Sequence, residues 1–249
     1  MKNGPSQKLG TYSLKMITTD PKIIAIAFLS GVVPALLWLW FWLREDTRKA
    51  EPKGLITMVF IVGMLTVLLV LPLQRLTQTF LFPHNFELIC FAAIEELMKL
   101  IMVLLVVFNT DQIDEPTDWP IYLMTLAVGF AGLENTLFLL KPFALGQTAV
   151  GLMTSELRFL GSTLLHSVTS GTIGVAMGLS YFSGNLKKFF YIIIGIIASI
   201  ALHSAYNFFI MKDEGSNFLQ VFSFLWVGAI LIMLIFEKLR RMNLLVNNN

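Results

Sequence analysis

The sequence predicts an all-α fold: a polytopic bundle of about seven membrane-spanning helices that form a single transmembrane domain over residues 1–249. Hydrophobic residues make up 56% of the chain and charged residues only 14%, whereas a soluble domain carries about 25% charged residues. Several apolar stretches reach the roughly 20 residues that a helix needs to cross a hydrocarbon layer. They lack the period-two alternation of strands, which indicates helices.

Each predicted span is a long apolar run between two more polar stretches. The polar segment 1–21 has no apolar core, so we expect no cleavable signal peptide and an insertion signal in the first span. The stretch 75–85 is neither fully apolar nor freely polar, and its placement as an interfacial or re-entrant piece stays open. In chain order, the predicted spans are 22–43, 54–74, 86–108, 119–140, 157–182, 189–210 and 218–236.

Lysine and arginine in short loops predict the orientation, because cytoplasmic loops are enriched in both. Three regions would share one side: the loop with Arg44, Arg48, Lys49 and Lys53, the loop with Lys187 and Lys188, and the C-terminal tail with Lys238, Arg240 and Arg241. This pattern favours a cytoplasmic C-terminus. The N-terminal lysines and the lysine-free loop 109–118 argue the other way.

The net charge and the cysteine count exclude few functional classes other than nucleic-acid binding. The net charge is only +2 and no basic block is dense enough for a nucleic-acid surface. Cys90 is the single cysteine, so no intramolecular disulfide is possible. The composition thus makes the lipid bilayer the expected surroundings, and it leaves the oligomeric state open.

Charged residues inside the predicted spans are the strongest functional signal. A charge at mid-helix costs about 2.5–3.5 kcal/mol on the insertion scale. The third span contains Glu95, Glu96 and Lys99. Pairing of Lys99 with Glu95 at i,i+4 or Glu96 at i,i+3 would recover part of that cost. A buried structural ion pair and a working site both remain possible for this cluster.

Three further spans carry polar residues at similar depth. Because consecutive helices run in opposite directions, Glu95, Glu134, His166 and His203 are expected within about 5 Å of one another along the membrane normal. Asn207 follows His203 by one turn on the same helix face. Unrelated structural residues have little reason to share a layer, so we predict one convergent site in the half of the membrane that faces the N-terminus.

Carboxylates, imidazoles and an amide are the materials of a hydrolytic metal centre. Zinc takes histidine nitrogen and glutamate oxygen, commonly with three protein ligands and an activated water in catalytic sites. The sequence has no HExxH motif, so any ligands must come from several helices. A serine mechanism is disfavoured because no Gly-x-Ser-x-Gly elbow occurs.

The order of these residues along the chain resembles the PrsW family of bacterial intramembrane metalloproteases. The matches are EELMK at 95–99, FAGLEN at 130–135, a histidine at 166 and HSAYN at 203–207. The related type II CAAX prenyl endopeptidases carry EExxxR and FxxxH motifs, where this chain has Lys99 and Glu134. The chain therefore looks like PrsW more than like those relatives.

The resemblance implies metal-assisted hydrolysis of a peptide bond within the membrane. It implies Glu95 as the leading general base with Glu96 assisting, Asn207 near the oxyanion, and a divalent metal, zinc in the first instance, as cofactor. Implied metal ligands are Glu134, His166 and His203, and the supporting residues are Lys99, Asn135 and Arg158.

The implied partner and location also follow from this family. The substrate would be a membrane-anchored protein such as an anti-sigma factor, cut on the outer side of the plasma (inner) membrane. Two rivals from other classes are a proton- or cation-coupled transporter that uses the buried carboxylates and a non-catalytic membrane scaffold. The transporter is disfavoured because the sequence shows no repeated halves.

Overall fold

The computed structural model confirms the all-α class and describes residues 20–44, 49–80, 82–108, 110–212 and 218–247. Among these residues there is no strand. The predicted polar segment 1–21, with Lys2, Lys8 and Lys15, lies almost entirely outside the described residues, and so does Arg48. The elements are α1 (Pro21–Leu43), α2 (Lys53–Gln78), α3 (His84–Val107), α4 (Asp118–Ala144), α5 (Thr148–Arg158), the π-helical segment η2 (Phe159–Thr163), α6 (Leu164–Leu179), α7 (Asn185–Lys212) and α8 (Phe218–Asn247).

Five of the described helices are long and apolar enough to cross a membrane: α1, α2, α4, α7 and α8. Of the other two predicted spans, α3 has spanning length but contains Glu95, Glu96 and Lys99. The predicted span 157–182 is replaced by α5, η2 and α6 in succession. The helical region therefore begins at Thr148, so the loop before it is shorter than predicted. Gly151 of α5 packs against the ring of Phe143.

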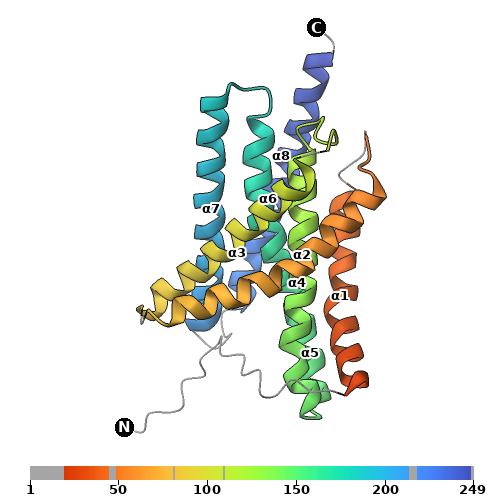
Figure 1. Ribbon diagram of the computed structural model, residues 1–249, viewed down its shortest axis with the longest axis vertical. Helices are drawn as coiled ribbons and strands as arrows, with labels where there is room; N and C mark the ends of the chain where they lie inside the picture. The colour runs from red at the N-terminus through yellow and green to blue at the C-terminus, as the bar shows by residue number, and fades with distance from the viewer. Residues whose placement is uncertain (1–19, 45–48, 81, 109, 213–217, 248–249) are drawn as a thin grey trace.

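Figure 1 shows α1, α4, α6, α7 and α8 along the long axis of the molecule, with α2 and α3 crossing them obliquely. The ends of α1, α3, α6 and α8 gather at the upper end. The start of α1, the α2–α3 turn and the α4–α5 turn lie at the lower end. The stretch 75–85 forms that α2–α3 turn with the neighbouring helix ends, and Leu81 within it is outside the described residues.

The central helix is α4, which packs against α1, α2 and α6. The helix carries a continuous buried run from Pro120 to Gly132, as expected for a helix surrounded by protein. Its crossing with α2 is very close. A Cβ on Gly63 would lie 2.1 Å from the Leu126 carbonyl oxygen, and one on Gly129 would lie 2.1 Å from the Phe60 carbonyl oxygen. Small residues allow such backbone contact between membrane helices.

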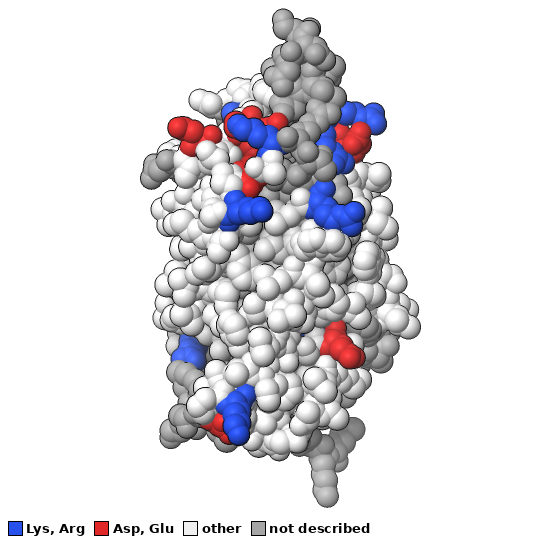
Figure 2. Space-filling view, turned by 90° about the vertical axis from the view of Figure 1, so that its right-hand side faces the viewer, with Lys and Arg blue, Asp and Glu red and all other residues white. Residues whose placement is uncertain are grey.

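The surface agrees with a lipid-embedded protein. Figure 2 shows a face on which lysine, arginine and the acidic residues gather at the two ends, with few charged side chains between them. Large apolar side chains are exposed on several of the long helices, for example Leu29 of α1, Leu68 of α2 and Ile194 of α7 at 57%, 54% and 63%. A soluble monomer rarely exposes contiguous apolar surface on this scale. The molecule is therefore a multi-pass membrane protein.

Candidate active site

Helices α3, α4, α6 and α7 bring the predicted polar residues into one cluster. His203 lies nearer the end of α7 than its start, and Glu134 nearer the end of α4. Both helices run toward the lower end of the bundle in Figure 1. The predicted common depth agrees with this arrangement, because side chains from all four helices are in contact.

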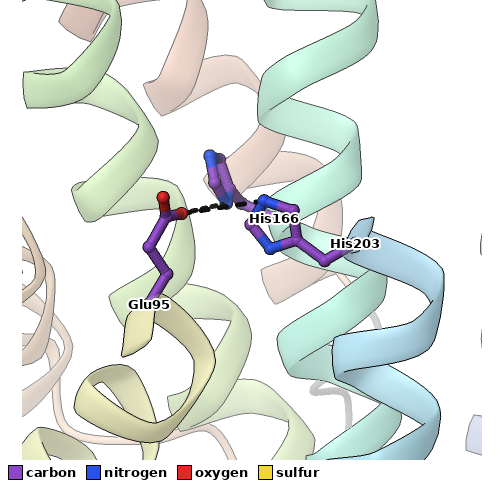
Figure 3. A group of neighbouring side chains, drawn as sticks. All are labelled: Glu95, His166 and His203. Carbon is purple, nitrogen blue, oxygen red and sulfur yellow. Dashed lines mark ion pairs between the residues drawn. The ribbon is translucent and has the colours of Figure 1, made fainter. Parts of the chain in front are cut away.

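Glu95, His166 and His203 form the centre of the cluster. Glu95 Oε2 lies 3.7 Å from His203 Nε2 and 4.0 Å from His166 Nδ1. Figure 3 shows the carboxylate of Glu95 pointing toward the two imidazole rings, which lie beside each other. All three residues are buried, and Glu95 Oε2 has no hydrogen-bond partner among the described residues. A buried acceptor without a donor is costly, so this oxygen indicates a place for a group outside the chain.

The second oxygen of Glu95 is held by a residue that the sequence analysis missed. Gln74, near the end of α2, donates from Nε2 to Glu95 Oε1 at 2.8 Å. A single amide in an apolar helix gives no periodic signal, and only its place one residue before the polar stretch 75–85 could have drawn attention to it.

Glu96 has the opposite surroundings, because five groups lie within hydrogen-bonding distance of its carboxylate. Lys99 Nζ and His203 Nδ1 each lie 2.8 Å from Oε1. The hydroxyl groups of three residues complete the cage, Thr169 at 3.1 Å, Ser170 at 2.8 Å and Ser199 at 3.2 Å. An ionised carboxylate offers about four lone-pair sites, so this carboxylate is saturated. No contact of these three hydroxyl groups with Glu96 was predicted from the sequence.

Each histidine directs one ring nitrogen toward Glu95 and the other toward a second carboxylate. His203 Nδ1 contacts Glu96 Oε1, and His166 Nε2 lies 3.2 Å from Glu134 Oε2. Metal-binding histidines usually donate their outer N–H to a carboxylate in this way, which fixes the orientation of the ring.

Lys99 is fully buried and bridges the two halves of the site. Its Nζ lies 2.8 Å from Glu96 Oε1 and 2.8 Å from His166 Nδ1, above the ring of Phe130. An ammonium group only donates. His166 Nδ1 therefore accepts, and Nε2 carries the ring hydrogen that points at Glu134.

Glu134, predicted as a metal ligand, lies on the far side of the His166 ring from Glu95. Its Oε2 pairs with Arg158 Nη2 at 2.5 Å, and Arg158 Nε donates to Asn135 Oδ1 at 2.6 Å. The guanidinium also lies 3.7 Å from the centre of the Phe138 ring. Glu134 and Arg158 are each 18% exposed, so this pair is the more open side of the cluster. By its position, Glu134 is a hydrogen-bond partner of His166.

The π-helical segment η2 connects Arg158 to the helix of His166. Trp38 of α1 donates from Nε1 to the carbonyl oxygen of Phe159 at 2.9 Å. A π-helical turn disturbs the regular backbone ladder, and such turns are frequent at functional sites. Asn207 lies one turn beyond His203 on α7 and is half-buried.

The central residues fit a divalent metal by type and spacing. One ligand atom from each of Glu95, His166 and His203 lies within 4.8 Å of the others. Two imidazoles and a carboxylate are a ligand set that zinc takes in catalytic sites, and the buried Glu95 oxygen lacks a protein partner. One contact opposes a metal: Lys99 uses the His166 Nδ1 lone pair that the ion would need.

The fold and this cluster define a polytopic membrane protein with a polar cluster buried among its helices. Residues 51–236 match the model of the PrsW family intramembrane metalloproteases, and the chain belongs to this family. It is 27% identical over 206 residues to "Protease PrsW" of Geobacillus kaustophilus, covering 81% of this chain and 88% of the relative. It is 28% identical over 210 residues to "Protease PrsW" of Oceanobacillus iheyensis, covering 81% and 91%. No solved structure matches the chain. The protein is an intramembrane peptidase.

Proposed function

We propose that this peptidase cleaves a membrane-anchored protein near the outer face of the plasma membrane, with Glu95 activating the attacking water. The observation that carries the proposal is the buried Glu95 oxygen without a partner, directed at two imidazoles. Its neighbour Glu96 has no free lone pair, which supports Glu95 as the base and Glu96 as an anchor for His203 and Lys99.

In the proposed reaction, Glu95 Oε2 takes a proton from water held beside His166 and His203. The resulting hydroxide adds to the scissile carbonyl carbon, and the side-chain amide of Asn207 donates to the developing oxyanion. Glu95 then returns the proton to the leaving amine, so the carboxylate is regenerated. A divalent metal held by the imidazoles of His166 and His203 would polarise the water and the carbonyl when bound, and Glu95 Oε2 beside them would stay available as the base. Glu134 and Glu96 keep the two rings oriented.

A metal-free version of the same hydrolysis is the second candidate, and one contact favours it. Lys99 Nζ lies 2.8 Å from His166 Nδ1, and an ammonium group and a metal ion cannot share that lone pair. If no metal binds, Glu95 acts on water positioned by the imidazoles alone. The anti-sigma-factor class of substrate and zinc as the ion come from the family resemblance and belong to the proposal.

The test uses the full chain purified in detergent, with its zinc content measured and a membrane-anchored peptide reporter library supplied. Glu95→Gln and His203→Ala should lower cleavage strongly. Glu87→Gln, a change to a glutamate on the same helix that pairs with His84, should cleave like wild type. Stoichiometric zinc that is lost in His203→Ala supports the metal version, and cleavage that survives chelation supports the metal-free one.

The rival classes give different results in the same preparation. A folded wild-type protein that cleaves none of the reporters overturns the peptidase and favours the scaffold. Solute-coupled proton flux into liposomes that disappears in Glu95→Gln would favour the transporter.

A further inference from the structure

We propose that Gln74 is a positioning residue for Glu95, which it holds so that one carboxylate oxygen faces the reaction centre. This inference rests on the proposed function of Glu95. It starts from the hydrogen bond between Gln74 Nε2 and Glu95 Oε1, which joins α2 to α3 at 2.8 Å.

The two oxygens of Glu95 have unequal surroundings. Oε1 accepts from Gln74, and Oε2 is left 3.7 Å from His203 Nε2 and 4.0 Å from His166 Nδ1. Without a donor on Oε1, the terminal torsion of a glutamate is broad and nearly two-fold. Either oxygen, or neither, would then face the imidazoles. The Gln74 amide removes this freedom by fixing the plane of the carboxylate.

The chemistry needs this restraint because the buried site gives Glu95 few other partners. Glu96, one residue along, is oriented by five donors. For Glu95, Gln74 is the side-chain hydrogen-bond donor that the structure records. A group that takes and returns a proton must stay within hydrogen-bonding reach of water in a fixed direction.

The placement of Gln74 depends on the oblique course of α2. The helix crosses α4 at Gly63 in backbone contact and continues toward α3, with which it packs. Gln74 lies eleven residues beyond that crossing, about three helical turns. An α2 parallel to the other helices would carry this amide along the bundle and away from α3.

The test compares Gln74→Met, which keeps the length but removes the donor, with Gln74→Lys, which restores a donor. Gln78→Met, the same change one turn later on α2, is the matched control. For each full-length variant, kcat and KM on the membrane-anchored reporter, the zinc dissociation constant and the thermal unfolding midpoint are measured.

We expect Gln74→Met to lower kcat by about 10- to 100-fold, the range found when an outer partner of a site residue is removed. KM should change less than twofold, zinc binding should weaken in the metal version, and the unfolding midpoint should equal that of Gln78→Met. Gln74→Lys should recover part of kcat.

Two results overturn the proposal while the proposed function stands. One is a wild-type kcat in Gln74→Met. The other is an equal loss of kcat and stability in Gln74→Met and Gln78→Met, which would mean a purely structural role. A wild-type protein that neither cleaves nor binds metal overturns the proposed function itself, and the role of Gln74 falls with it.

Discussion

Glu95 and Glu96 are adjacent in the chain, yet burial has different consequences for them. The Glu96 carboxylate compensates the buried Lys99 ammonium and accepts from three hydroxyl groups and His203. Removing one partner of a buried ion pair leaves an uncompensated charge, which costs about 3–5 kcal/mol. Glu95 has one oxygen without a partner, so its charge adds little to stability.

From this contrast we expect Glu96→Gln to lower the free energy of unfolding by about 3–5 kcal/mol. We expect Glu95→Gln to leave unfolding nearly unchanged while it lowers kcat by about 10²–10⁴-fold. Denaturant unfolding in detergent, measured beside the reporter assay, checks both. Equal stability losses in the two variants would contradict the assigned difference.

At the same scale, the residues that the sequence predicted are those whose chemistry is conspicuous in an apolar helix. A charge or imidazole in a span is costly enough to be noticed, and the layer expected for Glu95, Glu134, His166 and His203 matches their contacts in the structure. The sequence alone did not show which of these residues contacts which. Whether Glu134 faces Glu95 or Arg158 depends on side-chain directions across three helices, and Gln74 carries no charge.

Among the elements, the π-helical segment η2 is hydrogen-bonded to a residue more than a hundred positions earlier. The Trp38 indole donates to the Phe159 carbonyl, and a buried carbonyl that loses its donor costs about 1–3 kcal/mol. Trp42, one turn along α1, is also buried, but its Nε1 has no hydrogen-bond partner among the described residues.

These two tryptophans provide a matched pair. Trp38→Phe should destabilise the protein by about 1–3 kcal/mol more than Trp42→Phe, because only Trp38 loses a hydrogen bond. It should also reduce cleavage, since η2 leads directly into the turn that carries His166. Thermal unfolding and kcat of both variants test this, and equal effects would show that the indole bond does not matter.

The glycine crossing between α2 and α4 is the second feature at this scale. A methyl group on Gly63 would meet the Leu126 backbone, which cannot move aside as a side-chain end can. Gly54, in the first turn of the same helix, has open space around it. We expect Gly63→Ala to lower stability by about 1–3 kcal/mol, and Gly54→Ala to raise it by up to about 1 kcal/mol. Denaturant unfolding measures both, and a neutral Gly63→Ala would disprove the close crossing.

The same two features explain which part of the fold was predictable. Apolar runs of spanning length are sufficient for the all-α class, because lipid leaves a chain few other ways to satisfy its backbone. The close crossing of α2 and α4 brings Gly63 against the Leu126 backbone and Gly129 against the Phe60 backbone, which are contacts between distant helices. The π-helical segment within the predicted span 157–182 has its Phe159 carbonyl hydrogen-bonded to Trp38 of α1. Neither is a local property of the segment that it shapes.

For the whole molecule, the arrangement of the ends fixes which loops share a side of the membrane. The ends of α1, α6 and α8 lie together at the upper end in Figure 1, as the lysine and arginine pattern predicted, and the α4–α5 turn lies opposite. The site lies nearer that opposite end. A substrate cut on the outer side therefore requires the upper end to be cytoplasmic.

Cysteine labelling tests this orientation. In a Cys90→Ser background, a cysteine replaces Lys141, exposed near the end of α4, or Lys187, exposed at the start of α7. We expect a membrane-impermeant maleimide to label the Lys141→Cys chain in intact cells. The Lys187→Cys chain should react only after permeabilisation, because the two positions lie at opposite ends of the bundle. The reverse pattern would place the active site nearer the cytoplasmic face, and cleavage on the outer side would then be excluded even if the peptidase chemistry stands. Labelling of both positions in intact cells would contradict their placement at opposite ends of the bundle.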